Sequence, residues 1–252
     1  MAISLSVVII TFNEERNIER CLKSLEGVAD EIVVVDSFSK DRTEEICSNF
    51  SVKFIQHAFE GHIQQKNFAI DAAANDWILS LDADEALTEE LKTSILQIKN
   101  QADYQGYSMN RLTNYCGHWV KYCGWYPDSK IRLVNRKQAR WTGVNPHDRL
   151  DMLENASFGQ LNGDILHYSY YSKADHLKQI EYFGNIAAKE LFDRGGKSNW
   201  PLIISKVIAQ FIKSYFLKLG ILDGSTGFTI SRLSAYATYQ KYLKLLNLQK
   251  GR

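Results

Sequence analysis

The alternation of apolar and amphipathic segments in the first hundred residues restricts the fold more than any other feature of the sequence. Apolar runs at residues 4–12, 31–36, 52–57 and 77–84 are each followed by a segment whose apolar residues recur at helical spacing. Apolar strands that alternate with helices are typical of a mainly parallel sheet covered on both faces. The sequence therefore predicts an α/β fold of this kind.

Polar side chains stand where three of these strands end. Thr11 and Phe12 close the first strand, Asp36 closes the second, and Asp82 and Asp84 follow the fourth. Ligands of open α/β sheets bind beyond the carboxyl ends of the strands. We therefore expect these side chains to meet in one crevice.

The stretch WILSLDADEAL ends in the carboxylates Asp82, Asp84 and Glu85, which repel one another unless a cation or hydrogen-bond donors lie among them. Capping of the next helix does not require them, because Thr88 suits that position. A calcium loop of the EF-hand type would need a glycine and a glutamate where other residues stand. The remaining interpretation is that these carboxylates bind a divalent cation, which in turn holds a diphosphate. Side chains two apart on an extended chain face the same way, so we expect Asp82 and Asp84 to point together.

The turn after the first strand reads TFNEER. It lacks the Gly-x-Gly-x-x-Gly fingerprint of dinucleotide-binding folds, which argues against a nicotinamide enzyme. Asn13 is the residue that can cap the helix that follows, and Glu14 and Glu15 suit the positive end of that helix's dipole.

Charge, cysteine usage and the first residues exclude several classes of protein. The formal net charge is +1, so no overall field attracts nucleic acid, and we expect none as a partner. The four cysteines match no familiar zinc spacing. The first apolar run has no basic region before it, unlike that of a signal peptide. We therefore expect a reduced, cytoplasmic protein.

The pattern changes after residue 100. The segments GYSMNRLTNY, SKIRLVNR and DILHYSY predict shorter strands of mixed direction, and a long helix is expected at about 173–194. We therefore predict a domain at 1–170 that consists of two halves, 1–100 and 101–170. A C-terminal helical extension is predicted at 171–252.

Four segments of the first hundred residues resemble one known family. SVVIITFNEERNIERCLKSL, VVVDSFSKDRT, QKNFAI and WILSLDADE are similar, in order and spacing, to family 2 of the inverting nucleotide-sugar glycosyltransferases, which have the GT-A fold. GHWVKYCGWYPDSKIRLVNR, ARWTGVNPHDRL and GILDGSTGF resemble the branch of lipopolysaccharide inner-core β-glucosyltransferases. The resemblance implies sugar transfer from a nucleotide-sugar, a UDP-hexose in that branch, to a saccharide or glycolipid acceptor in lipopolysaccharide or other cell-envelope glycan synthesis. It also implies that residues 1–100 are the nucleotide-binding half of the domain and residues 101–170 the acceptor half.

The resemblance also implies residues that bind the donor. Thr11, Phe12 and Glu14 would line the pocket for the base and ribose, and Asp36 would accept a hydrogen bond from a uracil N–H. Lys66 would contact the nucleotide or its phosphates. Two alternatives stay open: Phe12 as a core residue and Lys66 as a solvated helix lysine.

A bound Mn²⁺ or Mg²⁺ is implied in the same way. Asp84 would bind the ion, Asp82 would contact the ion or the ribose, and His167 would reach the ion from a late strand. A histidine flanked by apolar residues is also common in protein cores, so that alternative for His167 stays open.

The resemblance further implies an acidic residue that acts as the base on the acceptor hydroxyl. Asp148 in NPHDRL and Asp128 in GWYPDSK are the candidates, and we favour Asp148. Each could instead serve only in a salt bridge. Trp125 is expected to pack on the sugar of the acceptor, as aromatic faces do in saccharide sites.

Three other functions compete with this one. A related transferase could use a GDP- or ADP-sugar, and a protein of the same fold could bind nucleotide-sugars without catalysis. A sugar-nucleotide pyrophosphorylase would need a glycine- and arginine-rich loop after the first strand, where TFNEER stands instead. The carboxylates and His167 argue against the non-catalytic alternative.

The stretch at 201–219 is strongly apolar but carries lysines, so it is too charged to span a bilayer. Two interpretations stay open. It is either a core helix or a helix that lies in the cytoplasmic interface of the inner membrane, with its lysines at anionic headgroups. Such peripheral contact would bring the active site to a lipid-linked acceptor.

Overall fold

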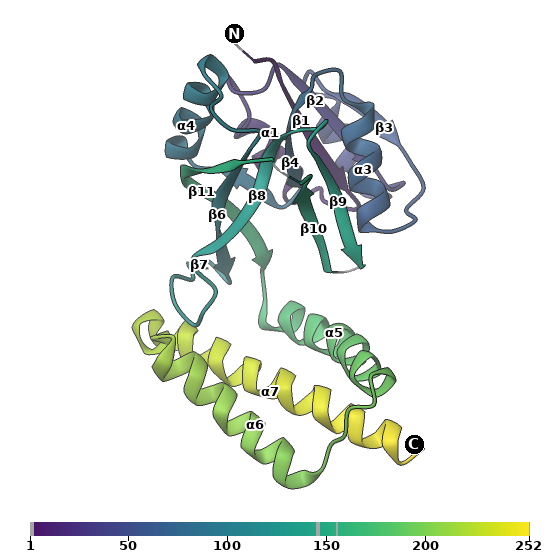
Figure 1. Cartoon of the computed structure of the whole chain (residues 1–252), viewed down its shortest axis with the longest axis vertical. Coiled ribbons are helices and arrows are strands. Elements are labelled where there is room, and N and C mark those ends of the chain that lie inside the picture. The colour runs from purple at the N-terminus through teal and green to yellow at the C-terminus, as the bar shows by residue number, and fades with distance from the viewer. Residues whose placement is uncertain (1–2, 145–146, 155, 252) are drawn as a thin grey trace. The chain divides into compact units, whose positions relative to one another are not determined.

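A large mixed sheet and a set of C-terminal helices form the structure, a computed structural model that describes residues 3–144, 147–154 and 156–251 (Figure 1). The strands are β1 Leu5–Thr11, β2 Glu31–Asp36, β3 Lys53–Gln56, β4 Trp77–Asp82, β5 Glu85–Leu87, β6 Gly106–Tyr115, β7 His118–Trp119, β8 Asp128–Asn135, β9 Ala139–Val144, β10 His147–Met152 and β11 Phe158–Tyr170. The helices are α1 Ile18–Lys23, α2 Thr43–Cys47, α3 His62–Ala72, α4 Glu89–Asn100, α5 Lys173–Asp193, α6 Trp200–Ile212 and α7 Gly224–Gln249, with a π-helical turn η1 at Lys213–Leu217 and a 3₁₀ turn η2 at Gly220–Asp223.

The first half of the sheet is parallel. β1 lies between β2 and β4, and β3 lies beyond β2, all with the same direction. β8 then joins β4 in the opposite direction, and the sheet continues through β6 and β11 to the short β5. The predicted α/β fold with a mixed, mainly parallel sheet is thus confirmed. The continuous apolar runs explain it, because a strand buried on both faces needs apolar side chains at every position.

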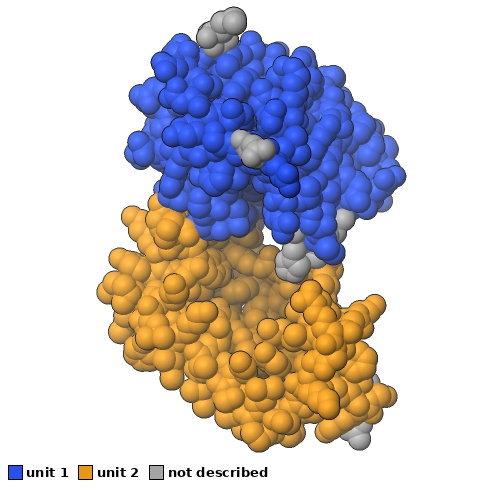
Figure 2. Space-filling view, viewed as in Figure 1, with its two compact units in different colours: residues 1–111, 128–168 blue, residues 112–127, 169–252 orange. Residues whose placement is uncertain are grey.

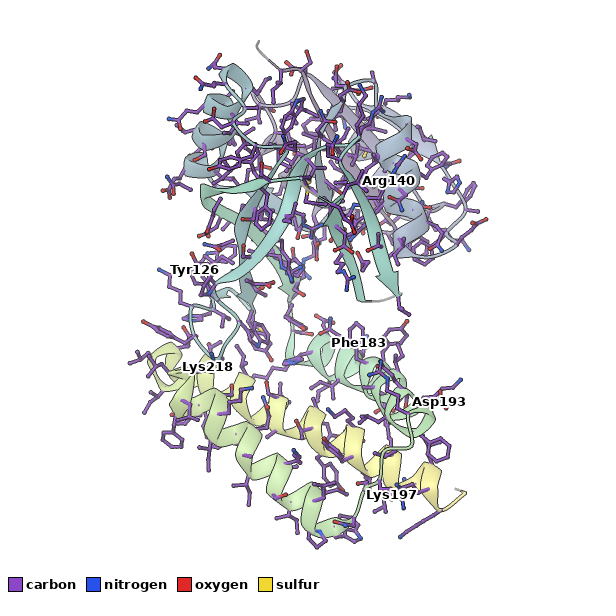
Figure 3. The ribbon with its side chains drawn as sticks, in the orientation of Figure 1. Tyr126, Arg140, Phe183, Asp193, Lys197 and Lys218 are labelled. Atoms are coloured by element: carbon purple, nitrogen blue, oxygen red, sulfur yellow. The ribbon has the colours of Figure 1, made fainter. Side chains whose placement is uncertain are left out.

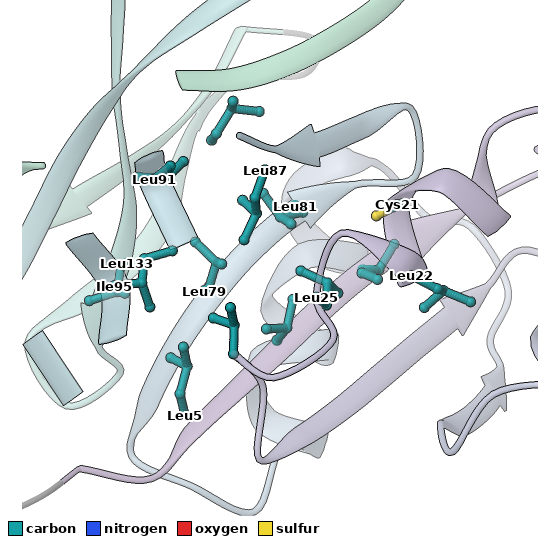
Figure 4. Packing of buried hydrophobic residues seen from close by; sticks show 14 of the residues in the cluster. Leu5, Cys21, Leu22, Leu25, Leu79, Leu81, Leu87, Leu91, Ile95 and Leu133 are labelled. Carbon is teal, nitrogen blue, oxygen red and sulfur yellow. The ribbon is translucent and has the colours of Figure 1, made fainter. Parts of the chain in front are cut away.

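Apolar side chains of β1 alternate between the two faces of the sheet. Leu5 and Ile9 belong to the core on one face, which α1 closes with Leu22 and α4 with residues such as Leu91 (Figure 4). Val8 points to the other face and belongs to the core that α3 closes. The sheet is therefore covered on both faces, so its edge at the carboxyl ends of the strands is the part that stays open to ligands.

The prediction that Asn13 caps the first helix is wrong. α1 begins only at Ile18, with Asn17 at its N-cap position. Asn13 has φ of 55° and joins two loops: its N–H donates to Ser39 Oγ at 2.8 Å, and its side-chain oxygen accepts from Lys40 N at 2.8 Å. An asparagine tolerates this left-handed conformation better than most residues do, so the turn after β1 uses it there. By contrast, Thr88 does cap α4, because its Oγ1 accepts from the backbone N–H of Leu91.

The described chain divides into two compact units (Figure 2). The first unit comprises residues 1–111 and 128–168, and it holds almost all of the sheet. The second comprises residues 112–127 and 169–252. In the second unit, α5 and α6 each pack against α7, and the segment 112–127 contributes Tyr115 to the core that α5 shares with α7.

A close approach of two glycines fixes the turn that joins α6 to α7. A Cβ atom on Gly227 would lie 1.8 Å from the carbonyl oxygen of Gly220. Any side chain at residue 227 would therefore push η2 away from the start of α7. This explains why the segment GILDGSTGF has glycine at that point.

Candidate active site

The carboxyl ends of β1, β2 and β4 lie side by side because these strands are parallel and in register. Thr11 of β1 pairs with Asp36 of β2, and Ile10 of β1 pairs with Asp82 of β4. Polar side chains from three separate segments therefore meet at this edge, which is where open α/β sheets bind ligands.

Lys66 of α3 reaches this edge and is almost wholly buried. Its Nζ lies 3.1 Å from Oδ1 of Asp82, 2.8 Å from Oδ2 of Asp148 and 4.2 Å from the ring centre of Trp141. Only 6% of its side chain is exposed, so the interpretation of Lys66 as a solvated helix lysine is wrong. A buried ammonium group needs carboxylate partners, and Lys66 thereby joins β4 to β10.

Arg132 and Glu85 form a buried ion pair beneath Asp82. The guanidinium Nη2 of Arg132 lies 3.0 Å from Glu85 Oε1 and 3.4 Å from Asp82 Oδ2. Glu85 also accepts from the backbone N–H of Asp82 at 3.0 Å. Burial by itself would raise the pKa of Asp82, but the charges of Lys66 and Arg132 outweigh burial and hold this pKa well below its ordinary value. Asp82 is therefore a fixed negative charge.

Sequence reasoning missed the roles of Glu85 and Arg132. The sequence shows Glu85 only as one of three carboxylates after a strand, and it predicts no functional role for Arg132. The available signal was the position of Arg132 between Ile131 and Leu133, since an arginine within an apolar strand needs a buried partner.

Asp82 and Asp84 have different partners, because the extended chain on which the expectation for them rests ends at Asp82. β4 ends at Asp82, and the chain turns at residues 83 and 84 before β5 begins at Glu85. The turn directs Asp84 to His167 on β11, whose Nε2 lies 3.1 Å from Asp84 Oδ2. Alternation holds only on an extended strand, so the two aspartates serve different partners.

His167 is held beside Asp84 because β11 pairs with β5. Its register partner is Glu85, and the N–H of Tyr168 donates to the carbonyl oxygen of Asp84 at 2.9 Å. Burial opposes a charge on the imidazole, but the negative charge of Asp84 and the hydrogen bond to it outweigh burial and raise the pKa of His167. His167 is therefore not a plain core histidine, since a specific carboxylate faces it.

The pair of Asp84 and His167 has the donor atoms and spacing that a divalent cation requires. Neighbouring ligands of an octahedral ion lie about 3 Å apart when its bonds are about 2.1 Å long. The 3.1 Å between Asp84 and His167 matches this spacing and is also an ordinary hydrogen bond. Within the described part of the chain, no three histidine, cysteine or acidic side chains are gathered as a metal site. These two residues would thus supply only part of a coordination shell, which substrate phosphates and water could complete.

Glu14 adds to the negative charge at this edge. Its Oε2 accepts from Asn17 Nδ2 at 2.7 Å. Burial raises the pKa of Glu14 to about 7, the hydrogen bond from Asn17 opposes the rise, and the nearby charges of Asp84, Asp41 and Asp82 add to it. An excess of negative charge of this kind is relieved when a cation binds, so the local electrostatics fit a bound metal ion.

We expect Glu14→Gln to stabilise the protein above pH 7 and to change its stability little below pH 4.5. Between the ordinary pKa of 4.5 and about 7, the folded state binds a proton that the unfolded state releases. The free energy of unfolding of the wild type therefore falls as pH rises through this range, and glutamine removes that loss. The expected gain at pH 8 is roughly 1–3 kcal/mol.

Thermal unfolding with a metal chelator at pH 4.5 and pH 8 measures this effect. The exposed Glu26, replaced by glutamine, is the matched control. An equal effect of Glu14→Gln at both pH values would show that Glu14 has an ordinary pKa.

The ends of β1 and β2 form the remainder of the edge. Phe12 is 56% exposed, so its interpretation as a core residue is wrong. Thr11 is buried, and its Oγ1 has no hydrogen-bond partner among the described residues. Asp36 is fully buried, and its carboxylate accepts from the backbone N–H of Ser39 at 2.8 Å and from Ser39 Oγ. Asp36 thus holds the loop that follows β2, while Phe12 presents its ring to solvent.

The two candidates for the base have different surroundings. Asp128 lies 2.8 Å from Arg111 Nη2 and 2.9 Å from Lys130 Nζ. Burial alone would raise the pKa of Asp128, but the hydrogen bond from Lys130 and the charge of Arg111 outweigh burial and lower it. Asp128 therefore does take part in salt bridges. The partner of Asp148 is Lys66, whereas Arg149 pairs with Asp151.

Trp125 belongs to the second unit, whereas the residues above all belong to the first. It packs in an aromatic cluster, with ring centres 5.6 Å from Tyr170 and 6.0 Å from both Tyr115 and His176. This cluster forms part of the core of the second unit. Packing in that core explains the position of Trp125 without any ligand.

The sequence matches a family model described as glycosyl transferase family 2 over residues 6–149. An uncharacterized glycosyltransferase of Rickettsia typhi is 33% identical, and the match covers 97% of this chain and 87% of the relative. LpsC of Rhizobium meliloti, a lipopolysaccharide core biosynthesis glycosyltransferase, is 24% identical over 94% of this chain and 93% of its own length.

Among solved structures, a mannosyltransferase of Pyrobaculum calidifontis in complex with GDP-Man and Mn²⁺ has a similar fold. The TM-score is 0.56 at 14% sequence identity, and the match covers 99% of this chain and 87% of that one. At this identity the likeness concerns the fold alone.

Proposed function

Since this chain belongs to glycosyltransferase family 2, we propose that it transfers a hexose from a UDP-hexose, with inversion, to a saccharide or glycolipid acceptor of the lipopolysaccharide core or another envelope glycan. The observation that carries this proposal is the meeting of Lys66, Asp82 and Asp148 beside the pair of Asp84 and His167 at the carboxyl end of β4. This arrangement places fixed cations, fixed anions and a candidate base at one edge.

The nucleotide would lie along the ends of β1 and β2. The exposed ring of Phe12 can pack on a flat base, and the unpartnered Oγ1 of Thr11 can hydrogen-bond to the ribose. Glu14 stands beside them on the same turn. The family resemblance implies that Asp36 accepts a hydrogen bond from uracil. In this structure its carboxylate holds the loop after β2 through Ser39, so Asp36 would influence binding of the base by fixing the position of that loop.

Asp84 and His167 would hold a Mn²⁺ or Mg²⁺ ion, with Asp82 close by to bind a ribose hydroxyl or a metal-bound water. When bound, the ion would act as a Lewis acid on the diphosphate of the donor. The solved mannosyltransferase with a similar fold contains Mn²⁺. Lys66 offers a positive charge for the departing diphosphate, beside Asp82.

Asp148 would act as the base in the transfer. It would accept the proton of the acceptor hydroxyl while the oxygen of that hydroxyl bonds to the anomeric carbon of the sugar. The bond from this carbon to the diphosphate oxygen breaks, and its electron pair leaves with the nucleoside diphosphate. Asp128 suits this role less, because Lys130 and Arg111 lower its pKa and a weaker base accepts a proton less readily.

The proposed class of acceptor is supported by the function of a relative. LpsC acts in lipopolysaccharide core biosynthesis and matches nearly the whole chain. We therefore propose a core saccharide, linked to lipid or not, as the acceptor.

We expect UDP and UDP-hexoses with Mn²⁺ to raise the unfolding temperature, and GDP-, ADP- and nicotinamide nucleotides to have little effect. A ligand that binds only the folded state stabilises it by about 2.7 kcal/mol at a hundred times its Kd. Thermal shift with each nucleotide, with and without Mn²⁺, measures this. A larger shift with GDP-mannose would contradict the proposed donor, and a shift without any turnover on core saccharides would favour the non-catalytic alternative.

A further inference from the structure

The basic and acidic residues are unevenly distributed along the chain. Residues 194–252 contain ten of the 30 lysines and arginines, but only one of the 29 acidic residues, Asp223. The remainder of the chain therefore carries the compensating negative excess. A net charge near zero conceals a strongly basic C-terminal segment.

The single acidic residue of this segment is turned inward. Asp223 is buried, and its carboxylate accepts from the backbone N–H of Tyr122 at 2.9 Å and lies 3.2 Å from Nε2 of His118. By contrast, Lys206, Lys213 and Lys218 are all exposed. Among the described residues of 194–251, no carboxylate therefore reaches the surface to neutralise these cations.

α6 and η1 expose a row of large apolar side chains. Trp200, Ile204, Ile208, Ile212 and Phe216 recur at every fourth position, and each is between 44% and 57% exposed. Residues four apart are neighbours on a helix surface, so this row is continuous. The row is unusual because single exposed apolar residues are common but contiguous ones are not.

The row continues beyond the helix into the turn that follows. Leu217, Leu219, Ile221 and Leu222 are also exposed. We call these four residues and the five above the α6 apolar face. α6 packs against α7 on its other side and buries only Ile203 fully among its own residues. The interpretation of α6 as a core helix is therefore wrong.

Positive charges border the α6 apolar face along its length. Lys206 and Lys213 lie on the same stretch of helix, and Lys197 and Lys218 stand near its two ends (Figure 3). None of the helices in the described ranges is long and apolar enough to cross a membrane. An amphipathic helix with a tryptophan, an apolar face and bordering lysines has the features of one that lies in a membrane interface.

We propose that the α6 apolar face binds to the surface of an anionic membrane, with its side chains among the acyl chains and the bordering lysines at phosphate headgroups. The charge favours a lipid surface over a second copy of this chain, because two copies would bring the same unneutralised lysines together. The part of this inference that concerns a lipid-linked acceptor rests on the proposed function. An enzyme held at the cytoplasmic face of the inner membrane would meet a glycolipid acceptor there. Membrane binding itself does not depend on the reaction.

Co-sedimentation of the full chain with phosphatidylcholine vesicles, with and without phosphatidylglycerol, tests the proposal. We expect binding to the anionic vesicles that weakens with salt, since surface charges are screened. Ile204→Glu with Ile208→Glu should abolish sedimentation. Lys206→Gln with Lys213→Gln should reduce the affinity about tenfold or more, at about 1 kcal/mol for each lysine. The matched control is Tyr182→Glu with Phe192→Glu, which replaces two exposed apolar residues of α5.

Each other outcome overturns the proposal. The wild type could fail to bind anionic vesicles, or the α6 and α5 variants could bind equally. A dimer in light scattering that Ile204→Glu with Ile208→Glu dissociates, with no vesicle binding, would assign the face to a second copy. Because the replaced residues are exposed, circular dichroism should show an unchanged fold. Thermal shift with UDP tests the donor site separately, so failure of one proposal is distinguishable from failure of the other.

Discussion

Asp84→Asn is expected to abolish sugar transfer while the protein stays folded. Asparagine keeps the size of the side chain but removes the charge that would hold the cation with His167. Loss of a bound metal removes several kcal/mol of charge stabilisation, which corresponds to about three powers of ten or more in rate. Steady-state rates with UDP-sugars in Mn²⁺ measure this loss, and isothermal titration with Mn²⁺ in the presence of UDP measures ion binding directly.

Two comparisons make this test specific. Asp193→Asn replaces an exposed carboxylate at the end of α5 and should leave both the rate and Mn²⁺ binding unchanged. The unfolding temperature of Asp84→Asn should stay close to that of the wild type, because asparagine keeps the size of the side chain and its amide oxygen can still accept a hydrogen bond from His167. An Asp84→Asn rate within a few-fold of the wild type would contradict a role of Asp84 in metal binding.

The sheet could be predicted because its determinants are local. Each parallel strand reads as an unbroken apolar run, such as residues 5–11 and 31–36, and each run needs only its own residues to be recognised. The carboxyl edge follows from the same pattern, because parallel strands in register end together. The helix cap at Thr88 was also local, since it depends on the residues of a single turn.

Partners from distant segments could not be predicted. The helix lysine Lys66 follows two glutamines and looks solvated in sequence, yet it is buried between Asp82 and Asp148, which lie 16 and 82 residues away in the sequence. The ion pair of Glu85 and Arg132 joins β5 to β8 in the same way. Such pairs are set by the order of strands in the sheet, which a single sequence does not specify.

Departures from regular geometry account for the remaining differences. The turn at residues 83 and 84 gives Asp84 a different partner from Asp82, although alternation along a strand predicts that the two face the same way. The left-handed conformation at Asn13 removes it from the helix that it seemed to cap. Propensity rules describe continuing strands and helices, and functional edges of α/β sheets lie where those elements stop.

Charge balance also limits what can be inferred from sequence totals. The overall charge of +1 excludes a general attraction to polyanions, but it says nothing of where the charges lie. Only burial values show that the carboxylate of Asp223 is hidden while Lys206 and Lys213 are exposed. The positive charge on the surface of the second unit can therefore be inferred only when it is known which side chains its fold buries.

Asp148→Asn is expected to lower kcat by roughly two to four powers of ten, the usual contribution of a general base. Donor binding should survive, because Lys66 keeps its second partner, Asp82, at 3.1 Å. Turnover with a core saccharide acceptor measures the first effect, and thermal shift with UDP and Mn²⁺ measures the second. The same two measurements on Asp128→Asn should show a much smaller loss, since Lys130 and Arg111 lower the pKa of Asp128 and make it a weaker base.

The comparison of these two variants separates catalysis from structure. If Asp148 served only to neutralise Lys66, its loss would leave a buried ammonium group with one carboxylate, and the unfolding temperature and UDP binding would fall together with the rate. A base should instead lower the rate alone and change its dependence on pH, because the proton acceptor has been removed. A large loss of turnover in Asp128→Asn, with near-normal turnover in Asp148→Asn, would transfer the role to Asp128. It would also mean that substrate binding displaces Arg111 and Lys130, since the ion pairs that now hold Asp128 would have to open before it could accept a proton.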